Sequence, residues 1–496
     1  MTKNLHFIRI LLFIICLVLI FLSYPTSSLS ATSDVKANLE KYIEQYIEKY
    51  RVPGLSAAIL HEGEVFYTNA WGVTGESGEQ VTAETPFLLG SISKSLTGLA
   101  IMKLIEEEKI KLEDPVQSHL PWFSLKDEND SKIKVKHLLA QTSGLSSYSG
   151  LLLSDKGSKN EDSIKLNVKK LSNTKLTSVP GKKHQYSGAN YLILGALIEE
   201  VSGQSFSEYM EQQIFLPLGM SHSVADHKSA KEMGLESGYQ SWFGYPVKSN
   251  ISYDNGGSPY GYMAANTNDM IHYLKFINGN HFLKKDHFQE YFSPLFETKD
   301  NVYYGFGWRF SEPKKEDMIW HNGSTPDSRS EIFYLPDSGW SGVILTNKNH
   351  VLEEEYLSYL KFGIINILNG EEPEELPNHI PILRLITLGV AALLVCPLGI
   401  VIYKRKQFRD HLKLRGILKV WGVFSILLSI VIVPILVKSL GTPWYSISIY
   451  APDLAWIIRL IILLLILNGL ISLFVAGKKR SGVFQNQGNR NHHFNL

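Results

Sequence analysis

The stretch FLLGSISKSLTG, residues 87–98, contains the pattern S-x-x-K at Ser91 and Lys94, directly before an apolar helical pattern. A serine at such a position is often a helix cap. The same geometry also suits a nucleophile, because the positive helix end favours a developing alkoxide and Lys94 lies on the same face one turn later. A lysine held away from water loses basicity and can accept the serine proton. The pattern recurs at Ser33, Ser131, Ser172, Ser311 and Ser358. The rest of the chain must therefore decide between a cap and a nucleophile.

Length, charge and cysteine content limit the class of protein. A chain of 496 residues is too long for one ordinary core, so we expect at least two structural regions. The net charge of +1 argues against nucleic-acid binding, which needs a basic surplus. Cys16 and Cys396 both lie in apolar runs. No structural disulfide and no thiolate metal site is therefore expected in any soluble part.

The N-terminus has the pattern of a secretory signal. A basic start is followed by the uncharged apolar run 10–24, and small residues surround Ser30 and Ala31. We predict a signal peptide over residues 1–31, with an uncleaved anchor helix as the alternative. Either interpretation predicts that the following chain is exported.

The C-terminal part contains three apolar segments, 385–403, 420–437 and 460–476, each close to the length of a membrane span. Basic residues follow the first and third segments. The positive-inside rule then makes the first loop and the tail 477–496 cytoplasmic, and the chain before 385 extracytoplasmic. We predict a multi-pass cell-membrane protein that contacts lipid through these helices. Arg459 is the one charge noted within or beside a span, which gives no support for transport.

Between these ends, residues 35–369 have ordinary globular composition, and 370–384 form an acidic, proline-containing linker. Periodicity predicts a helix at 35–49 and then a hairpin from strands 55–60 and 65–72, with its turn at Glu62 and Gly63. Helical patterns follow at 95–108, 137–144 and 190–203, then strands at 331–336 and 341–347 and a last helix at 353–368. This order predicts an α+β fold. Both ends of the segment build one antiparallel sheet, and a helical region is inserted between them.

Two further motifs carry chemistry. In HQYSGANYLILG, 184–195, Tyr186 could relay a proton to a leaving group, or could simply pack at a helix start. In WHNGSTPDSRSEIFYLP, 320–336, His321 and Gly323 precede an apolar strand, and an edge strand there could present N–H groups to an acyl group. A strand-end histidine in a turn is the alternative. The chain has no H-E-x-x-H spacing and no glycine-rich phosphate loop after a strand, so we expect no metal and no cofactor.

The order of these motifs resembles that of serine β-lactamases and penicillin-binding proteins. Further stretches resemble the branch with class C β-lactamases, D-alanyl-D-alanine carboxypeptidases, D-aminopeptidases and family VIII esterases. They are VKHLLAQTSGL (135–145), IFLPLGM (214–220), YGFGW (304–308) and YLPDSGWSGVILTN (334–347). The resemblance covers residues 37–368. It implies a β-lactamase/transpeptidase-like fold, in which terminal helices flank the antiparallel sheet, followed here by three transmembrane helices.

The resemblance also implies roles for individual residues. Ser91 is the acylated nucleophile, Lys94 its neighbouring amine, and Tyr186 the acid/base partner, with the first proton acceptor left open between Lys94 and Tyr186. His321 takes the position of a Lys or His that anchors or polarises the substrate. The backbone N–H groups of Ser91 and Ser324, beside Gly323, would form the oxyanion hole.

One position departs from the motifs of the resembled family. The second motif is usually Y-x-N, and here it reads Tyr186-Ser187-Gly188. Asn190 is a candidate substrate ligand two residues further on, although in a helix it would point elsewhere. Losing a hydrogen-bonding side chain should widen or redirect specificity and disfavour efficient β-lactam hydrolysis.

The expected function is that of a membrane-anchored extracytoplasmic serine hydrolase, working through an acyl-enzyme on amide or ester bonds next to D-amino acids. The expected substrates are D-amino-acid peptides, esters or β-lactams. Three alternatives stay open. The first is a peptidase that removes an N-acyl-D-amino-acid cap from a secreted natural product. An exported hydrolase domain followed by three membrane helices resembles the arrangement of such membrane-bound peptidases. The others are a β-lactamase or esterase, and a non-catalytic penicillin sensor.

Overall fold

A computed structural model describes residues 27–279, 282–299, 301–311, 317–378 and 381–478. The chain divides into two compact units, Met1–Asn378 and His379–Leu496. The predicted signal peptide lies outside the described residues up to residue 26, and the predicted tail does so from residue 479.

The first unit is built on an eight-stranded antiparallel sheet in the order β2-β1-β12-β11-β10-β9-β8-β7. The predicted hairpin is confirmed: β1 (Gly54–His61) pairs with β2 (Glu64–Gly72), and both Glu62 and Gly63 have positive φ, as a type I′ turn requires. The other strands are β7 (Phe296–Lys299), β8 (Val302–Gly305), β9 (Trp308–Ser311), β10 (Met318–Ser324), β11 (Arg329–Leu335) and β12 (Trp340–Thr346). The predicted sheet built from both ends of the segment is confirmed, because β12 pairs directly with β1.

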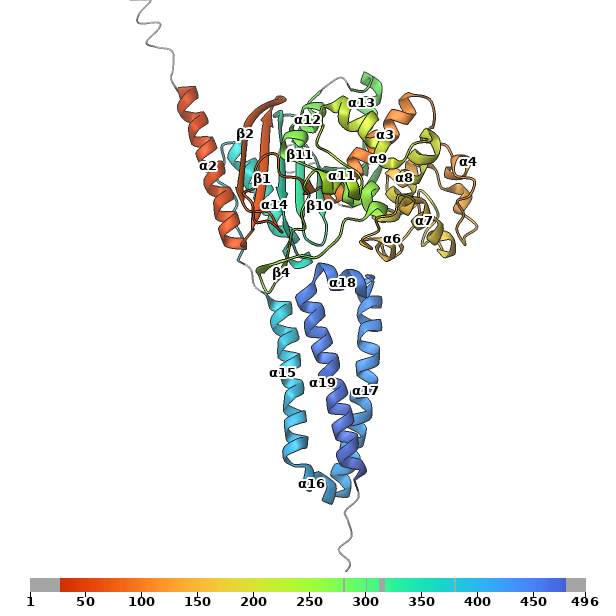
Figure 1. The fold of residues 1–496 in the computed structure, drawn as a ribbon, viewed down its shortest axis with the longest axis vertical. Helices are drawn as coiled ribbons and strands as arrows, with labels where there is room; N and C mark the ends of the chain where they lie inside the picture. Colours follow the sequence, from red (N-terminus) through yellow and green to blue (C-terminus); the bar gives the residue numbers. More distant parts are fainter. Residues whose placement is uncertain (1–26, 280–281, 300, 312–316, 379–380, 479–496) are drawn as a thin grey trace, which may run out of the picture. The chain divides into compact units, whose positions relative to one another are not determined.

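The two faces of this sheet bury different cores (Figure 1). On β1, Ala57 and Ile59 pack with helices α2 (Ser27–Tyr50) and α14 (Glu354–Leu368). Ala58 and Leu60 point to the other face, where α3 (Ser93–Glu106), α8 (Gly188–Ser202) and α12 (Thr267–Ile277) lie. This alternation of side chains is the period of two that a strand imposes.

Helices predominate over strands between β2 and β7, as predicted. The predicted helices at 95–108 and 190–203 are α3 and α8. The helical pattern at 137–144 gives only a short helix, α5 (Val135–Leu139), because Gln141 adopts a positive φ of 58°. The other helices are α4 (Val116–His119), α6 (Ser147–Leu153), α7 (Ser163–Lys170), α9 (Phe206–Met210), α10 (Leu216–Leu218), α11 (His227–Glu232) and α13 (Lys285–Tyr291). Two small sheets accompany them, β3 (Phe87–Leu88) with β6 (Ala264–Ala265), and β4 (Tyr239–Trp242) with β5 (Tyr245–Lys248) and β13 (Lys348–Asn349).

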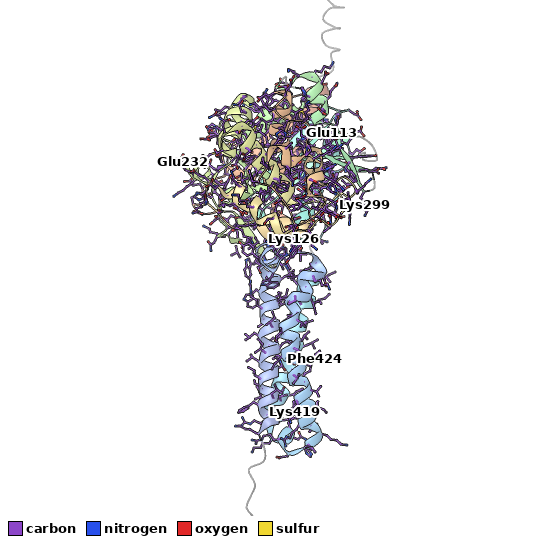
Figure 2. All side chains as sticks on the ribbon, turned by 90° about the vertical axis from the view of Figure 1, so that its right-hand side faces the viewer. Glu113, Lys126, Glu232, Lys299, Lys419 and Phe424 are labelled. Atoms are coloured by element: carbon purple, nitrogen blue, oxygen red, sulfur yellow. The ribbon has the colours of Figure 1, made fainter. Side chains whose placement is uncertain are left out.

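In its described residues, 381–478, the second unit contains three helices that are long and apolar enough to cross a membrane, by length and composition. They are α15 (Ile382–Tyr403), α17 (Leu412–Leu440) and α19 (Pro452–Gly477), accompanied by α16 (Arg405–Asp410) and α18 (Trp444–Tyr450). Figure 2 shows Phe424 and Lys419 on α17, where both side chains are exposed. Helices α17 and α19 meet at Gly422 and Gly469, where a Cβ atom on Gly469 would come within 3.0 Å of the Gly422 carbonyl oxygen. Small residues thus allow the close helix contact that is common between membrane spans.

The ends of two of these helices carry a charged pair that the sequence analysis missed. Arg384 Nε and Asp453 Oδ2 lie 2.6 Å apart, and both side chains are buried. The expectation that Arg459 is the one charge beside a span is therefore wrong. The pair joins the first turns of α15 and α19, and a buried charge with a partner costs far less than an isolated one.

Candidate active site

Ser91 and Lys94 lie together at the start of α3. Ser91 belongs to a single 3₁₀ turn, Gly90–Ile92, that runs directly into the helix. The Lys94 amine donates a hydrogen bond to Ser91 Oγ at 2.8 Å and another to the carbonyl oxygen of Tyr260 at 2.7 Å. No side chain caps this turn or α3, so the interpretation of Ser91 as a helix cap is wrong.

The Lys94 amine is held away from water. The side chain is 2 % exposed, whereas Ser91 is half-buried. Burial lowers the pKa of Lys94 below its ordinary value of 10.5; the nearby Tyr186 phenol opposes this shift, and the positive charge of Arg309 adds to it. A lysine in this environment loses its proton more readily than a solvated one and can act as a base toward the adjacent hydroxyl.

Tyr186 lies over the Lys94 amine, with Nζ 4.9 Å from the centre of its ring. Backbone contacts on both sides fix this position, because the Tyr186 carbonyl accepts from Ser147 Oγ at 2.6 Å and the Ser187 N–H donates to Gln141 Oε1 at 3.0 Å. Ser91 and Lys94 thus form one cluster with Tyr186, which lies far from them in the sequence.

His321 lies on β10 and is fully buried. Its Nδ1 is 2.7 Å from the Asn322 carbonyl oxygen, so Nδ1 carries the proton, and Nε2 faces the Tyr304 hydroxyl at 3.4 Å. Burial, with the positive charges of Arg309 and Lys94, holds the pKa of His321 well below its ordinary value of 6.5. The ring is therefore neutral, and it borders the cluster through Tyr186, whose ring centre is 6.1 Å away.

The end of β10 lies directly against the segment that carries Ser91. A Cβ atom on Gly90 would clash with the backbone nitrogen of Ser324, and one on Gly323 would clash with the Leu89 carbonyl oxygen. Gly90 also has a positive φ of 52°. Glycine at both positions thus permits the close approach of the Ser91 and Ser324 backbones. β10 is internal to the sheet rather than an edge strand, but β9 pairs only with Met318–Trp320, which leaves this end open.

Asn190 does not join the cluster. Its side chain is fully buried, accepts from Ser143 Oγ at 2.5 Å and donates to Gln141 Oε1 at 2.5 Å. Because α8 already includes this residue, the amide points into the protein, as helical geometry requires. The geometry disagrees with the candidate role of Asn190 as a substrate ligand and gives it a part in anchoring the loop after α5.

Comparison with known families agrees with this arrangement. The sequence matches the family described as Beta-lactamase over residues 39–361. The chain belongs to the β-lactamase family. It is accordingly a serine hydrolase with the α+β fold of β-lactamases and transpeptidases.

Several proteins of known name or structure are similar to this β-lactamase-family chain. Protein flp of Staphylococcus aureus (strain N315) is 28 % identical over 342 residues, covering 68 % of each chain. Teichoic acid D-alanine hydrolase of Staphylococcus aureus is 34 % identical over 185 residues, 37 % of this chain and 44 % of the relative. An octameric penicillin-binding protein homologue from Pyrococcus abyssi is 26 % identical with a TM-score of 0.61, covering 71 % of this chain and 81 % of the homologue. A D-stereospecific amidohydrolase from Streptomyces sp. shares the fold, with a TM-score of 0.53 and 22 % identity. The match covers 63 % of this chain and 94 % of the amidohydrolase chain.

The structure explains how this β-lactamase-family chain accommodates Gly188. A Cβ atom on Gly188 would lie 3.2 Å from the ring of Tyr260, which is buried. The ring therefore occupies the space into which a side chain at 188 would extend. The carbonyl of the same tyrosine accepts the hydrogen bond from Lys94. Tyr260 was not predicted from the sequence, because a backbone carbonyl leaves no signal in the residue types.

Arg309 is a second functional candidate that the sequence analysis missed. Its guanidinium carbon lies 5.4 Å from the ring centre of Tyr186, 5.7 Å from that of Tyr304 and 5.5 Å from that of Trp320. Among the described residues, no carboxylate pairs with it. A single arginine directly after the YGFGW run, 304–308, was the available signal.

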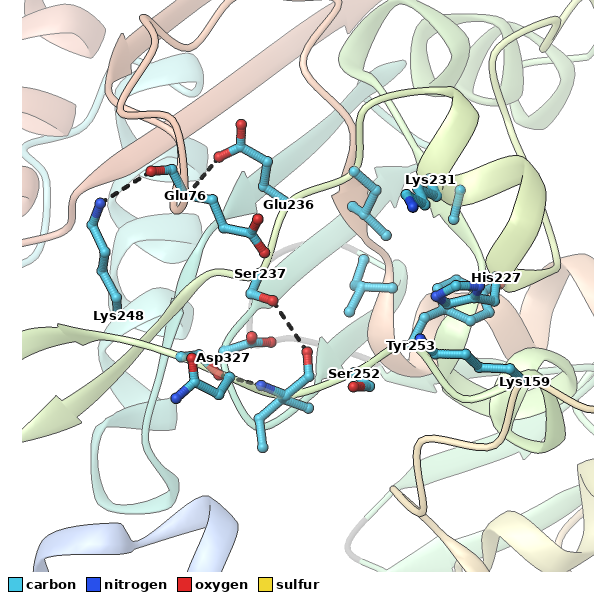
Figure 3. A pocket seen from close by; sticks show the side chains of 16 residues that line it. Glu76, Lys159, His227, Lys231, Glu236, Ser237, Lys248, Ser252, Tyr253 and Asp327 are labelled. Atoms are coloured by element: carbon cyan, nitrogen blue, oxygen red, sulfur yellow. Dashed lines mark hydrogen bonds between the residues drawn. The ribbon is translucent and has the colours of Figure 1, made fainter.

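A separate cavity of about 630 Å³ lies elsewhere in the first unit (Figure 3). Lys159, His227, Lys231 and Tyr253 gather at one end of it, and Glu76, Glu236 and Lys248 lie at the other. Three carboxylates, including the buried Asp327, face three lysines, so the charges of the lining nearly balance. None of Ser91, Lys94 and Tyr186 lines this cavity.

Proposed function

We propose that the protein is a membrane-anchored serine hydrolase that acts outside the cytoplasm, through an acyl-enzyme, on an amide or ester bond next to a D-amino acid. The observation that carries the proposal is the 2.8 Å contact between Ser91 Oγ and a buried Lys94 amine of lowered pKa. Apolar helices of spanning length support the membrane anchor. The name of the relative Teichoic acid D-alanine hydrolase supports the D-amino acid.

In this mechanism the neutral Lys94 amine removes the proton of Ser91 as Oγ bonds to the carbonyl carbon. The carbonyl oxygen becomes an oxyanion, which the N–H groups of Ser91 and Ser324 stabilise. When the bond to the leaving group breaks, the proton passes from Lys94 by way of Tyr186 to the departing nitrogen or oxygen. Water then attacks the acyl carbon with the same groups acting in reverse, and Ser91 recovers its proton.

Arg309 suggests that the leaving group of the substrate carries a negative charge. The Arg309 guanidinium lies beside the reacting groups and pairs with no carboxylate in the described part of the chain. It fits a substrate carboxylate, because such pairs form strong charge-assisted hydrogen bonds. We therefore favour leaving groups that end in a free carboxylate, as in a carboxypeptidase, over substrates that end in an amide.

Covalent labelling of the full chain tests the nucleophile. We expect fluorescent penicillin or a fluorophosphonate to label the wild-type protein, and Ser91→Ala to abolish labelling while the protein stays folded. Unaltered labelling of the folded Ser91→Ala protein contradicts the assignment. Burst labelling without turnover on any substrate points instead to a penicillin sensor.

A substrate series tests the class of reaction. It contains D-alanyl-D-alanine peptides with a free or amidated C-terminus, D-alanyl esters, N-acyl-D-amino-acid amides and a chromogenic cephalosporin. We expect Arg309→Gln to reduce turnover of the free-carboxylate peptide by about 10-fold or more, and to spare the amidated peptide. Arg51→Gln is the matched control, since Arg51 also stacks on a tyrosine ring, 4.4 Å from the centre of Tyr245.

A second candidate function is the removal of an N-acyl-D-amino-acid cap from a secreted natural product. The three apolar helices favour it, because a single helix would suffice as an anchor. Preferential cleavage of the N-acyl-D-amino-acid amides over the carboxylate-ended peptides supports this candidate and contradicts the carboxypeptidase-like proposal.

A further inference from the structure

The peptide between Gly323 and Ser324 has a defined orientation in the sheet. Gly323 pairs with Ser330 and Ser324 with Arg329, and the turn closes with the Thr325 N–H on the Ser328 carbonyl at 2.9 Å. Hydrogen-bonded and non-hydrogen-bonded pairs alternate along an antiparallel ladder. Because Thr325 and Ser328 are hydrogen-bonded, Ser324 and Arg329, the next pair along the ladder, form a non-hydrogen-bonded pair. The Ser324 N–H points away from β11, toward the segment that carries Ser91.

The buried guanidinium of Arg329 binds the carbonyl oxygen of this peptide, on the side opposite the Ser324 N–H. Arg329 is 5 % exposed, and its Nη1 donates to the Gly323 carbonyl oxygen at 3.2 Å. In a trans peptide the carbonyl and the following N–H point in opposite directions, so fixing the first fixes the second. A positive group on the carbonyl also polarises the peptide and strengthens the N–H as a donor.

Helix α14 ties down both Arg329 and Ser324. Arg329 Nη2 donates to the Glu354 carbonyl oxygen at 3.2 Å, and Nη1 lies 3.7 Å from the Glu354 carboxylate. Ser324 Oγ donates to Glu354 Oε1 at 2.5 Å and accepts from Asn349 Nδ2 at 2.8 Å. The side chain of Ser324 is therefore directed to α14, and only its N–H is left toward Ser91.

We propose that Arg329 and Glu354 are positioning residues that orient the Ser324 N–H toward the oxyanion of the reaction. This inference rests on the proposed function, in which that N–H stabilises the tetrahedral intermediate. Neither residue touches the reacting atoms. Their contribution is preorganisation, which matters most for donors aimed at a charge that develops only in the transition state.

The test compares Glu354→Gln and Arg329→Lys with the wild-type full chain in detergent. Glu355→Gln is the matched control, because Glu355 is an exposed neighbour on the same helix. A boronic acid whose boron bonds to Ser91 Oγ mimics the tetrahedral intermediate, and the hydrolysis product serves as a ground-state ligand. Thermal unfolding of each variant verifies that it is folded.

We expect Glu354→Gln to lower kcat and boronic acid affinity together by about 10-fold, a fraction of the effect of removing an oxyanion donor outright. KM and product affinity should stay within about two-fold, because ground-state binding does not depend on this N–H. Arg329→Lys, which keeps the charge but loses the forked donors, should show the same pattern. A folded Glu354→Gln protein with wild-type kcat and boronic acid affinity overturns the inference, as does equal weakening of boronic acid and product. A wild-type chain that neither turns over substrate nor binds the boronic acid contradicts the proposed function instead.

Discussion

The protonation of Lys94 governs the pH dependence of acylation. The reactive form is the neutral amine, and burial lowers its pKa below 10.5. We therefore expect the rate of fluorophosphonate labelling to rise with pH, to level off above the lowered pKa and to show its midpoint below the ordinary lysine value of 10.5. The pKa of His321 is already far below 6.5, so this ring does not account for a rise near neutral pH.

Time courses of fluorophosphonate labelling of the full chain, recorded between pH 5 and 10, measure how the labelling rate depends on pH. Lys94→Arg is the matched variant, because a guanidinium keeps the positive charge but does not deprotonate. It should label at a small fraction of the wild-type rate at every pH. A wild-type rate that is flat over the range, or that climbs only near pH 10, contradicts Lys94 as the base.

Gly188→Asn should not create an amide-binding site. The new Cβ would lie 3.2 Å from the Tyr260 ring, so the ring must shift. The backbone carbonyl of Tyr260 accepts the hydrogen bond from the Lys94 amine, so a shift of this residue also disturbs Lys94. We expect kcat/KM to fall by about 10-fold on every substrate, since a misplacement of about 1 Å can cost about 100-fold. Gly188→Ala isolates the Cβ contact and should lose activity to a similar extent. Faster cephalosporin hydrolysis by Gly188→Asn would show that Tyr260 yields to the new side chain.

Residue types and their order predicted Ser91, Lys94 and Tyr186, because the proposed chemistry needs those side chains. They did not predict Tyr260 or Arg329, whose contributions depend on a backbone carbonyl and on a peptide orientation. Such contributions exist only once distant segments meet. Asn190 shows the opposite error, since a polar side chain near a motif was assigned to the substrate although it satisfies a buried loop.

At the scale of elements, the junction between α8 and the loop after α5 depends on Asn190. Asn190→Ala leaves Ser143 Oγ without its acceptor and removes one donor from Gln141 Oε1. Buried polar groups without partners cost about 1–3 kcal/mol each. We expect the free energy of unfolding of the first unit to fall by that amount while KM is unchanged. The exposed Asn173→Ala should change it by less than about 0.5 kcal/mol. A raised KM at unchanged stability would restore the role of Asn190 in substrate binding.

Elements with a strong local signal were predictable. Strand β1 is a short, almost wholly buried run that ends at a turn at Glu62 and Gly63, and α3 and α8 are long and apolar. Strands β7, β8 and β9 were missed, because each has only four residues and their order is set by successive pairing outward from β10. A segment this short carries too few periods to distinguish a strand from a loop.

At the scale of the whole molecule, composition predicts a linker from residue 370, whereas the first compact unit extends to Asn378. The acidic stretch from residue 370 was interpreted as a linker. Part of it instead packs on α2, where Leu376 is buried and the carbonyls of Glu374, Leu376 and Pro377 accept hydrogen bonds. Charged side chains suggest a solvated segment, but here the backbone carbonyls and the Leu376 side chain make the contacts.

The position of this boundary can be tested with two soluble fragments, 32–369 and 32–378. The longer one keeps the hydrogen bonds from Tyr42 to Glu374 at 2.9 Å, from Lys49 to Leu376 at 2.6 Å and from Tyr50 to Pro377 at 2.7 Å. The shorter one loses them, loses the burial of Leu376 and leaves the two tyrosine hydroxyls without these acceptors. We expect its free energy of unfolding to be about 2–5 kcal/mol lower in urea titrations. In the longer fragment, Leu376→Ala should cause an intermediate loss. Equal stability of the two fragments would mean that residues 370–378 are a free linker, as their composition suggests.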